Sequence, residues 1–191
     1  MPEPYDPLNY DNLARNVVSA LLEIEPAVLP PSDPFQGTGV YAMYYMGDLK
    51  YYRAIASPKC DIPIYVGKAI PKGGRKGTSE AGAKGYELFA RLQQHANSVK
   101  QAENLRLEHF KCRYLVVVPV WITLAERFLI DHFRPLWNTV VDGFGNHPPG
   151  AGRASMRRPR WDILHPGRAW AGRLQATETQ EDVIALLERN R

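Results

Sequence analysis

Cysteine is scarce in this sequence, which has only Cys60 and Cys112 among its 191 residues. Neither lies in a Cys-x-x-Cys or Cys/His arrangement that holds zinc, and this usage favours a reducing compartment. Long hydrophobic runs are also missing, because no apolar stretch approaches the roughly 20 residues that a membrane span needs. The first residues, Met1-Pro2-Glu3-Pro4, lack the charged-then-apolar pattern of a signal peptide. We therefore expect a cytoplasmic protein that is neither exported nor inserted in a membrane.

The composition limits the fold more than it limits the function. Hydrophobic residues make up 45% of the chain, which is enough for one substantial core, and no fixed-period repeat divides the sequence. The formal net charge is +4, and the sequence pI is about 9.1. A charge balance this modest permits an anionic partner without requiring one. The positions of the basic residues must therefore decide whether nucleic acid is the partner.

The hydrophobic spacing alternates between helical and extended patterns along the chain. Apolar residues recur at helical spacing over residues 12–24, 86–103, 122–133 and 181–189. β-Branched and aromatic residues cluster between turn residues at 39–46, 50–55 and 62–66, and again at 114–118. This order predicts a compact α/β core with a small mixed or antiparallel sheet flanked by helices. A proline-rich extended linker joins the first helix to the core, and after Pro135 the sequence predicts mostly irregular structure.

Two segments are rich in basic residues. Residues 69–85 interleave glycine with lysine and arginine and predict a loop, whereas residues 153–173 form the densest arginine segment of the chain. Basic groups placed in this way can follow a phosphate backbone. We predict that DNA is bound by Lys72, Arg75, Lys76, Lys84, Arg153, Arg157, Arg158 and Arg160. The first segment could instead be only a flexible linker, and His147 and His165, which border the second, could also touch DNA.

Two short motifs carry tyrosines on predicted strands. Gly39-Val40-Tyr41 lies on the first strand, and Ile64-Tyr65-Val66-Gly67-Lys68 lies at the end of a later one. Each motif alone is weak evidence, because tyrosine is ordinary on a half-buried strand. The polar residues that follow them in the chain carry more of the argument.

Four polar residues follow the tyrosine motifs in a distinctive order. Arg91 and His95 lie four apart and so share one face of a predicted helix, Glu126 lies on the next helix, and Asn138 follows that helix. This order resembles the GIY-YIG nuclease family over roughly residues 37–140, with valine in place of isoleucine in both triplets. The histidine at position 95 and the long glycine-rich loop resemble a narrower branch, the type II restriction endonucleases with a GIY-YIG core that cut CCGCGG.

The resemblance implies a division of the chain and a set of site residues. The catalytic core would span residues 37–141, preceded by an N-terminal helix and linker over 1–36 and followed by a basic DNA-contacting extension over 142–191. The implied catalytic residues are Tyr41, Tyr65, Lys68, Arg91, His95, Glu126 and Asn138. The implied cofactor is Mg²⁺ bound by Glu126, and Mn²⁺ could substitute for it. The implied partner is double-stranded DNA, and a cognate DNA methyltransferase is expected in the same system without being a physical partner.

Phosphodiester hydrolysis needs a nucleophilic water, a place for negative charge and help for the leaving oxygen. Glu126 is the one carboxylate of the implied set, and a single carboxylate suits one Mg²⁺, which keeps water and phosphate as its other ligands. Arg91 can hold a phosphate oxygen through its planar fork. In the family, Tyr65 orients or deprotonates the water, and because the pKa of a free tyrosine is near 10, we expect Lys68 and Arg91 to lower it. Asn138 is expected to fix the geometry of the site rather than to transfer protons.

Three functions stay open from the sequence. The first is a sequence-specific restriction endonuclease, the second is a repair or structure-selective GIY-YIG nuclease, and the third is a DNA-binding module without chemistry. The intact catalytic set argues against the third, because binding alone needs no carboxylate near phosphate. The separate roles of Tyr41 and His95 are also open.

A palindromic site presents the same bases twice, so a homodimer would read both halves with one set of side chains. The candidate contact surfaces are the N-terminal helix, with Leu13, Val17 and Leu21, and the C-terminal helix, with Val183 and Leu187. For the C-terminal helix, packing on the core of its own chain is an equally open alternative.

Overall fold

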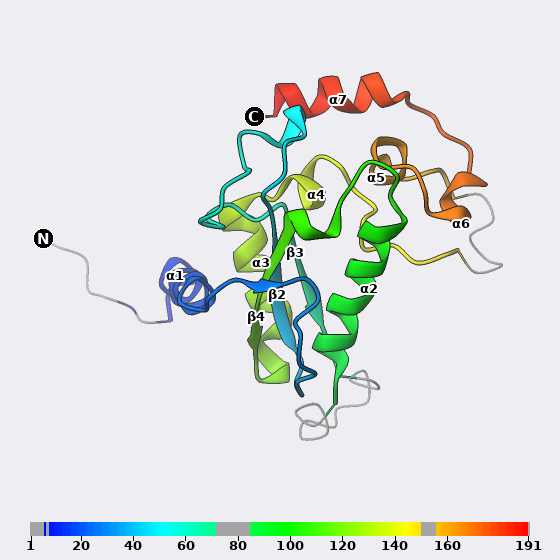
Figure 1. The fold of residues 1–191 in the computed structure, drawn as a ribbon. Coiled ribbons are helices and arrows are strands. Elements are labelled where there is room, and N and C mark those ends of the chain that lie inside the picture. Colours follow the sequence, from blue (N-terminus) through cyan, green and yellow to red (C-terminus); the bar gives the residue numbers. More distant parts are fainter. Residues whose placement is uncertain (1–5, 7, 72–84, 150–155, 191) are drawn as a thin grey trace, which may run out of the picture.

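A four-stranded antiparallel sheet forms the centre of the protein (Figure 1). The computed structural model describes residues 6, 8–71, 85–149 and 156–190. The strands are β1 (Ala27–Val28), β2 (Gly39–Tyr45), β3 (Tyr65–Ala69) and β4 (Phe110–Val116), in the order β1-β4-β2-β3. β2 is therefore central, whereas β3 forms one edge of the sheet. The predicted α/β class and the antiparallel alternative for the sheet are confirmed.

Helices cover both faces of this sheet. The long ones are α1 (Tyr10–Leu22), α2 (Glu87–Gln101) and α3 (Ile122–Phe133). Successive side chains of a strand point to opposite faces, so Tyr41 and Met43 of β2 pack on the α2 side, whereas Val40 and Ala42 pack on the side of α1 and α3. Every residue of β2 is buried as a result. The tyrosine of the first motif thus lies between the sheet and α2.

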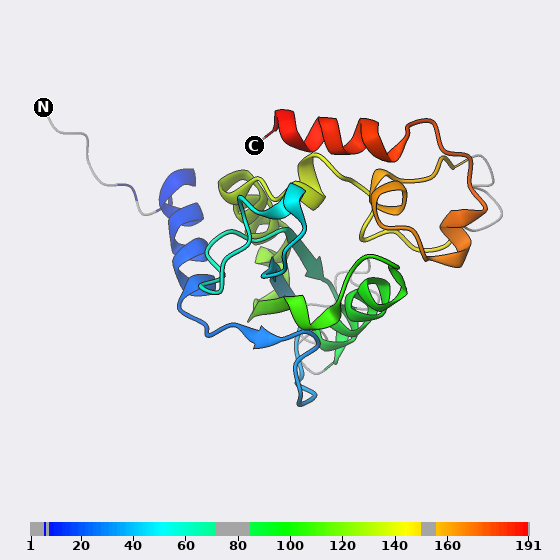
Figure 2. The same cartoon turned by 45° about the horizontal axis from the view of Figure 1, so that its top comes forward.

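The C-terminal extension packs into the same core. It follows α4 (Leu136–Thr139) and contains α5 (Arg160–Leu164), α6 (Ala169–Gly172) and α7 (Gln180–Arg189). Trp161 of α5 and Val183 and Leu187 of α7 are fully buried, in the cluster that also contains Tyr41. α7 contacts α5 and the 3₁₀ turn η1 (Lys50–Tyr52), and Figure 2 shows it, in red, running past both. The predicted segments 37–141 and 142–191 therefore share one hydrophobic core.

The predicted strand over residues 50–55 is wrong. The chain instead forms η1, in which the Tyr52 amide donates to the Leu49 carbonyl over 2.9 Å and the Ile55 amide donates to the Tyr52 carbonyl over 3.0 Å. These hydrogen bonds join residues three apart in the chain, so they form a turn and not a strand that pairs with a neighbouring strand. Tyr52 is fully buried, so the aromatic pattern that suggested a strand reflects core packing.

Other boundaries differ less from the prediction. β3 begins at Tyr65 rather than at Ile62, and β4 begins at Phe110 rather than at Tyr114. α3 spans the predicted residues, and α1, α2 and α7 lie close to theirs. Hydrophobic spacing does not indicate the short helices α4, α5 and α6 or the 3₁₀ turns η4 (Leu107–His109) and η5 (Pro119–Trp121).

Among the described residues, no helix is both long enough and apolar enough to cross a membrane.

A buried polar chain joins the extension to the core. The Trp137 indole N–H donates to the Tyr52 hydroxyl over 2.7 Å, and that hydroxyl lies 2.6 Å from His165 Nε2. Burial lowers the pKa of His165 to about 3, so the ring is neutral and its Nε2 accepts from Tyr52 while Nδ1 donates to Asn104 Oδ1 over 2.8 Å. His165 is fully buried. The expectation that His165 could touch DNA is therefore wrong.

Candidate active site

Tyr41 of β2 lies directly opposite a residue of the neighbouring edge strand β3. Its Cα partner in the sheet is Gly67, and a Cβ placed at Gly67 would overlap the Tyr41 hydroxyl oxygen. Any larger residue at position 67 would displace this ring, because the ring is fully buried and has no other room. The glycine of the second motif is thus required by the tyrosine of the first.

His95 of α2 holds the hydroxyl of Tyr41. Tyr41 Oη lies 2.6 Å from His95 Nε2, and the histidine is only 2% exposed. Burial first, and then the charge of Arg91, lowers the pKa of His95 well below its usual 6.5, so the ring is neutral at pH 7. A neutral Nε2 without a proton accepts the hydroxyl proton of Tyr41 in a hydrogen bond. Tyr65 completes this group, because its ring centroid lies 6.2 Å from that of Tyr41 and 5.2 Å from that of His95.

Both tyrosines of the site are harder to ionise than free tyrosine. Burial raises the pKa of Tyr41 well above 10 and also raises the pKa of Tyr65. Arg91 lowers both values in part, but burial outweighs it. The expectation that Arg91 and Lys68 would bring the pKa of Tyr65 below its ordinary value is therefore wrong. Both hydroxyls carry their protons at neutral pH and act as donors.

Glu126 approaches the site from the opposite face of the sheet. It lies on α3, and its Oε2 is 2.7 Å from the Nζ of Lys68 on β3, which also donates to the Thr123 hydroxyl over 3.4 Å. Because β3 is an edge strand, side chains from its two faces can converge around it. Burial is the main cause of the raised pKa of Tyr41 and Tyr65, and the negative charge of Glu126 adds a smaller upward contribution to both.

Arg91 of α2 is held by neutral acceptors. Its Nη1 donates to Gln94 Oε1 over 3.0 Å and lies 2.8 Å from His147 Nε2, while its Nη2 donates to the Gly145 carbonyl over 3.0 Å. In the described part of the chain, no carboxylate forms an ion pair with Arg91. Together with His95 and His147, this guanidinium lines a cavity of about 340 Å³. Its charge is therefore available to an anion that enters this cavity.

Asn138 of α4 binds the exposed edge of β3. Its Oδ1 accepts from the Val66 amide and its Nδ2 donates to the Val66 carbonyl, both over 2.8 Å. The amide thus replaces the partner strand that an edge strand lacks. Val66 directly follows Tyr65, so Asn138 fixes the backbone from which that tyrosine projects.

The predicted DNA-binding residues divide into three groups. Lys72, Arg75, Lys76, Lys84 and Arg153 lie outside the described residues. Arg157 is exposed, and no ion pair with it occurs among the residues described. Arg158 donates to the carbonyls of Ala171 and Gly172, and Arg160 forms a two-pronged ion pair with Glu178 at 2.8 and 2.9 Å. These contacts favour a structural role for Arg158 and Arg160, whereas DNA contact by the exposed Arg157 stays a prediction.

Sequence reasoning missed the segment that follows α4. Phe144 stacks on the ring of His95 with a centroid distance of 4.6 Å and meets the edge of Tyr65 at 5.0 Å. A Cβ at Gly145 would lie 2.7 Å from the Tyr65 hydroxyl, so only glycine fits there without movement. His147 contacts Arg91, whereas the sequence suggests only a DNA contact for this histidine. The glycines and prolines of this segment predicted irregular structure, which is correct, but irregular backbone gives no signal of what it packs against.

The chemistry of the donor set fits one hard divalent cation. In the described ranges, no group of three or more histidine, cysteine, aspartate or glutamate side chains could hold a metal ion. Mg²⁺ does not need such a group, because it binds through one or two carboxylates and keeps several water molecules. Glu126 is half-buried, and its Oε1 accepts no hydrogen bond from the residues described. One carboxylate oxygen is thus free for a cation.

Comparison with known proteins identifies a family. The family model described as the Eco29kI GIY-YIG domain matches residues 33–189, which is most of the chain. None of the curated proteins that were compared with this chain matches the chain. The matched range begins before β2 and ends within α7, so it includes both the site and the extension that packs against it.

Proposed function

The chain belongs to the Eco29kI GIY-YIG domain family, and from this premise we propose that it is a restriction-type nuclease that hydrolyses phosphodiester bonds of double-stranded DNA with one Mg²⁺ per active site. The observation that carries the proposal is the convergence around edge strand β3. Tyr41, Tyr65 and Arg91 lie on one face, and Glu126 lies on the other, 2.7 Å from Lys68 of β3. A phosphate at this edge would meet the Arg91 guanidinium, the hydroxyl donor of Tyr65 and a carboxylate together, while the Tyr41 hydroxyl donates to His95.

Arg91 supplies most of the positive charge for the substrate, and Lys68 has a different role. The guanidinium has neutral partners only, so a phosphate oxygen is the anion it lacks. Lys68 already pairs with Glu126 and stays on that carboxylate's side of the strand. We assign transition-state charge stabilisation mainly to Arg91 and the placement of Glu126 to Lys68.

The tyrosines orient the attacking water in this proposal. Tyr65 keeps its proton in the metal-free protein, so its oxygen accepts from water while its O–H donates to a neighbouring oxygen. Tyr41 donates to neutral His95 and therefore offers its own oxygen as an acceptor. Mg²⁺ bound by Glu126, or Mn²⁺ in its place, would lower the pKa of its bound water and offset negative charge on the phosphate.

We also propose that recognition is restricted to a GC-rich palindrome, CCGCGG. Such a site offers guanine O6 and N7 in the major groove, where arginine makes the commonest base-specific contact. Arg157 is the candidate reader in the described part of the extension, because its side chain is exposed and forms no ion pair there. The proposal also includes a cognate methyltransferase in the same system. It further includes a cytoplasmic location for the protein.

One digest tests the proposal. A sequenced plasmid would be incubated with purified protein and Mg²⁺, and a Glu126→Gln variant and EDTA would serve as matched controls. Discrete fragments that disappear in both controls support a site-specific nuclease, and mapping their ends gives the recognition sequence. Cutting of branched or flapped DNA alone would select a structure-selective nuclease instead. DNA that is retarded on a gel but never cut would select a binding module and overturn the proposal.

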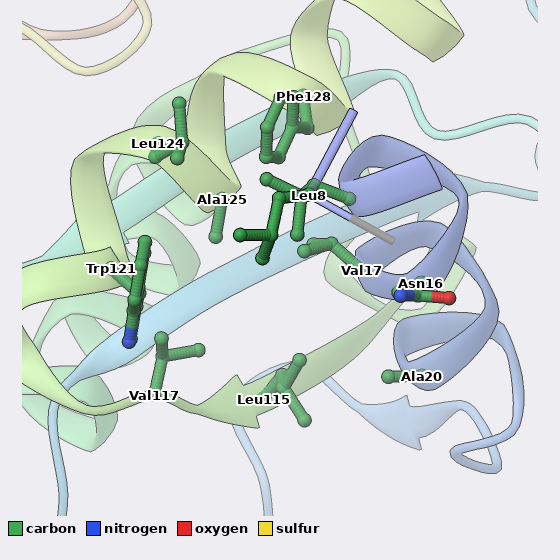
Figure 3. A pocket seen from close by; sticks show the side chains of 11 residues that line it. Leu8, Asn16, Val17, Ala20, Leu115, Val117, Trp121, Leu124, Ala125 and Phe128 are labelled. Atoms are coloured by element: carbon green, nitrogen blue, oxygen red, sulfur yellow. The ribbon is translucent and has the colours of Figure 1, made fainter. Parts of the chain in front are cut away.

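The proposal includes a homodimer, but three of the residues expected at its interface are not accessible to a second chain. Leu21, Val183 and Leu187 are fully buried within their own chain, so the prediction of contacts through them is wrong. Leu13 and Val17 of α1 remain accessible and line an apolar groove of about 320 Å³ between α1 and α3 (Figure 3).

We place the contact with a second copy of this chain at this groove. Trp121 lies on the opposite wall of the groove and is 55% exposed, which is unusual for so large an apolar side chain. Sedimentation with a cognate duplex is the test, and Trp121→Glu is the variant that should leave one chain per duplex. One wild-type chain per duplex, with nicked DNA accumulating before linear DNA, would contradict the dimer.

A further inference from the structure

The orientation of Arg91 depends on a segment that lies far from it in the chain. Three hydrogen bonds hold its Nη1 and Nη2 atoms: one is to Gln94 on its own helix, and two are to Gly145 and His147. The 2.8 Å contact to His147 Nε2 is the shortest of the three. Because Nη1 and Nη2 are both hydrogen-bonded on this side, the orientation of the planar guanidinium is fixed, and exchange of Nη1 and Nη2 by rotation about the Nε–Cζ bond is hindered.

His147 can act as an acceptor because it is neutral. Partial burial lowers its pKa first, and the charges of Arg91 and Arg168 lower it further. Arginine has only donors, so the contact requires an unprotonated Nε2 on the histidine. A neutral partner holds the guanidinium without cancelling the positive charge that a phosphate would meet. An acidic residue at the same position would hold it equally well but would repel the substrate.

The segment that carries Gly145 and His147 is itself held by Arg168. The Arg168 guanidinium donates to the carbonyls of Gly143, Phe144 and Asn146 at 3.0, 3.0 and 3.4 Å. A single buried side chain thus fixes three carbonyls on both sides of Gly145. The backbone of the segment is irregular, and the Arg168 donors add to its one internal hydrogen bond, from the Asn146 amide to the Gly143 carbonyl over 3.1 Å.

Arg168 is in turn fixed by its surroundings. It is 3% exposed and forms a two-pronged ion pair with Asp162 of α5 at 2.6 and 2.5 Å. Its guanidinium also lies over the rings of Trp161 and Trp170, at 4.4 and 4.8 Å from their centroids. This arginine belongs to the arginine-rich part of the extension, yet every contact it makes points inward.

We propose that His147 is a positioning residue that aims Arg91 at the substrate phosphate, and that the buried Arg168–Asp162 pair holds the segment from which His147 does so. The inference rests on the proposed nuclease activity. It gives the extension a role in catalysis that is separate from DNA contact: the extension sets the direction of a core side chain through the segment 143–147.

A double-mutant cycle tests whether His147 acts through Arg91. Single-turnover cleavage would be measured for wild type, His147→Ala, Arg91→Ala and the double variant, with His132→Ala on exposed α3 as the matched histidine control. We expect His147→Ala to lower the rate about tenfold with unchanged DNA affinity, since a hydrogen bond to a charged group is lost. In the Arg91→Ala background the same substitution should have no further effect. His147→Gln, which restores an acceptor, should recover part of the rate.

A second readout needs neither DNA nor metal. In the NMR spectrum of the wild-type protein, rotation about the Arg91 Nε–Cζ bond should be slow, and His147→Ala should speed it. Arg168→Lys keeps a cation for Asp162 but loses the donors to the three carbonyls, so it should speed the same rotation. Equal cleavage by wild type and His147→Ala, or additive losses in the double variant, would overturn the inference. Absence of cleavage by wild type would instead overturn the proposed function, so the two failures are distinguishable.

Discussion

The bond between Asn138 and the edge of β3 gives a prediction for stability. Asn138→Ala removes two hydrogen bonds of 2.8 Å and leaves the amide and carbonyl of Val66 without their partner. Each such bond contributes about 0.5–1.5 kcal/mol net, so the free energy of unfolding should fall by about 1–3 kcal/mol. For a chain of this size, the midpoint of thermal unfolding should fall by roughly 2–12 °C. Circular dichroism on heating measures this change.

Asn138→Asp separates the two bonds. An aspartate still accepts from the Val66 amide, but its second oxygen faces the Val66 carbonyl and repels it unless the carboxyl is protonated. The folded state therefore raises the pKa of this carboxyl, and the stabilising contact is present at low pH and lost as pH rises through that value. The deficit against wild type should shrink on acidification. Asn97→Ala on the exposed face of α2 is the matched control and should change stability by less than about 0.5 kcal/mol. An Asn138→Ala protein as stable as this control would refute the argument that Asn138 completes the edge strand.

Three further substitutions test other parts of the account. Tyr65→Phe removes only a hydroxyl, so it should slow single-turnover cleavage about 100-fold with little change in DNA binding. Tyr41→Phe should lower the rate in the same way. Wild-type cleavage rates for both variants would contradict the assignment of these tyrosines. Asp162→Ala leaves its buried arginine partner without a counter-charge and should cost about 3–5 kcal/mol in urea unfolding, whereas Glu178→Ala, at a more exposed pair, should cost at most about 1 kcal/mol. Arg157→Ala should weaken discrimination against single-base mismatches if it reads a base, whereas equal weakening on all duplexes with a flatter salt dependence would show a phosphate contact only.

The sequence was sufficient for the elements that follow periodic patterns. The strand around Tyr41 is a run of apolar and aromatic residues, the helix around Arg91 has apolar residues at helical spacing, and both lie close to their predicted bounds. The strand predicted around Tyr52 failed because buried aromatic residues pack equally well from a 3₁₀ turn. Periodicity measures which side chains are buried, and a short buried segment satisfies it in either conformation.

The candidate site was predictable where spacing along the chain carries it. Arg91 and His95 share a helix face, and the sheet brings Tyr41 beside Gly67. The contact of His147 with Arg91 was not predictable, because it depends on irregular backbone placed by a distant buried arginine. Arg168 has the same composition signal as a DNA-binding arginine, and only burial distinguishes the two roles.

The central claim is that this site hydrolyses DNA with the help of a cation at Glu126. The most direct measurement compares wild type and Glu126→Gln in single-turnover cleavage of one duplex containing the mapped site, with binding measured on the same duplex. The account predicts that the variant loses cleavage and binds DNA as tightly or more tightly, because a carboxylate near phosphate repels it when no cation intervenes and its removal frees Lys68. EDTA should reproduce the loss in wild type. Cleavage by Glu126→Gln at near the wild-type rate would contradict the claim.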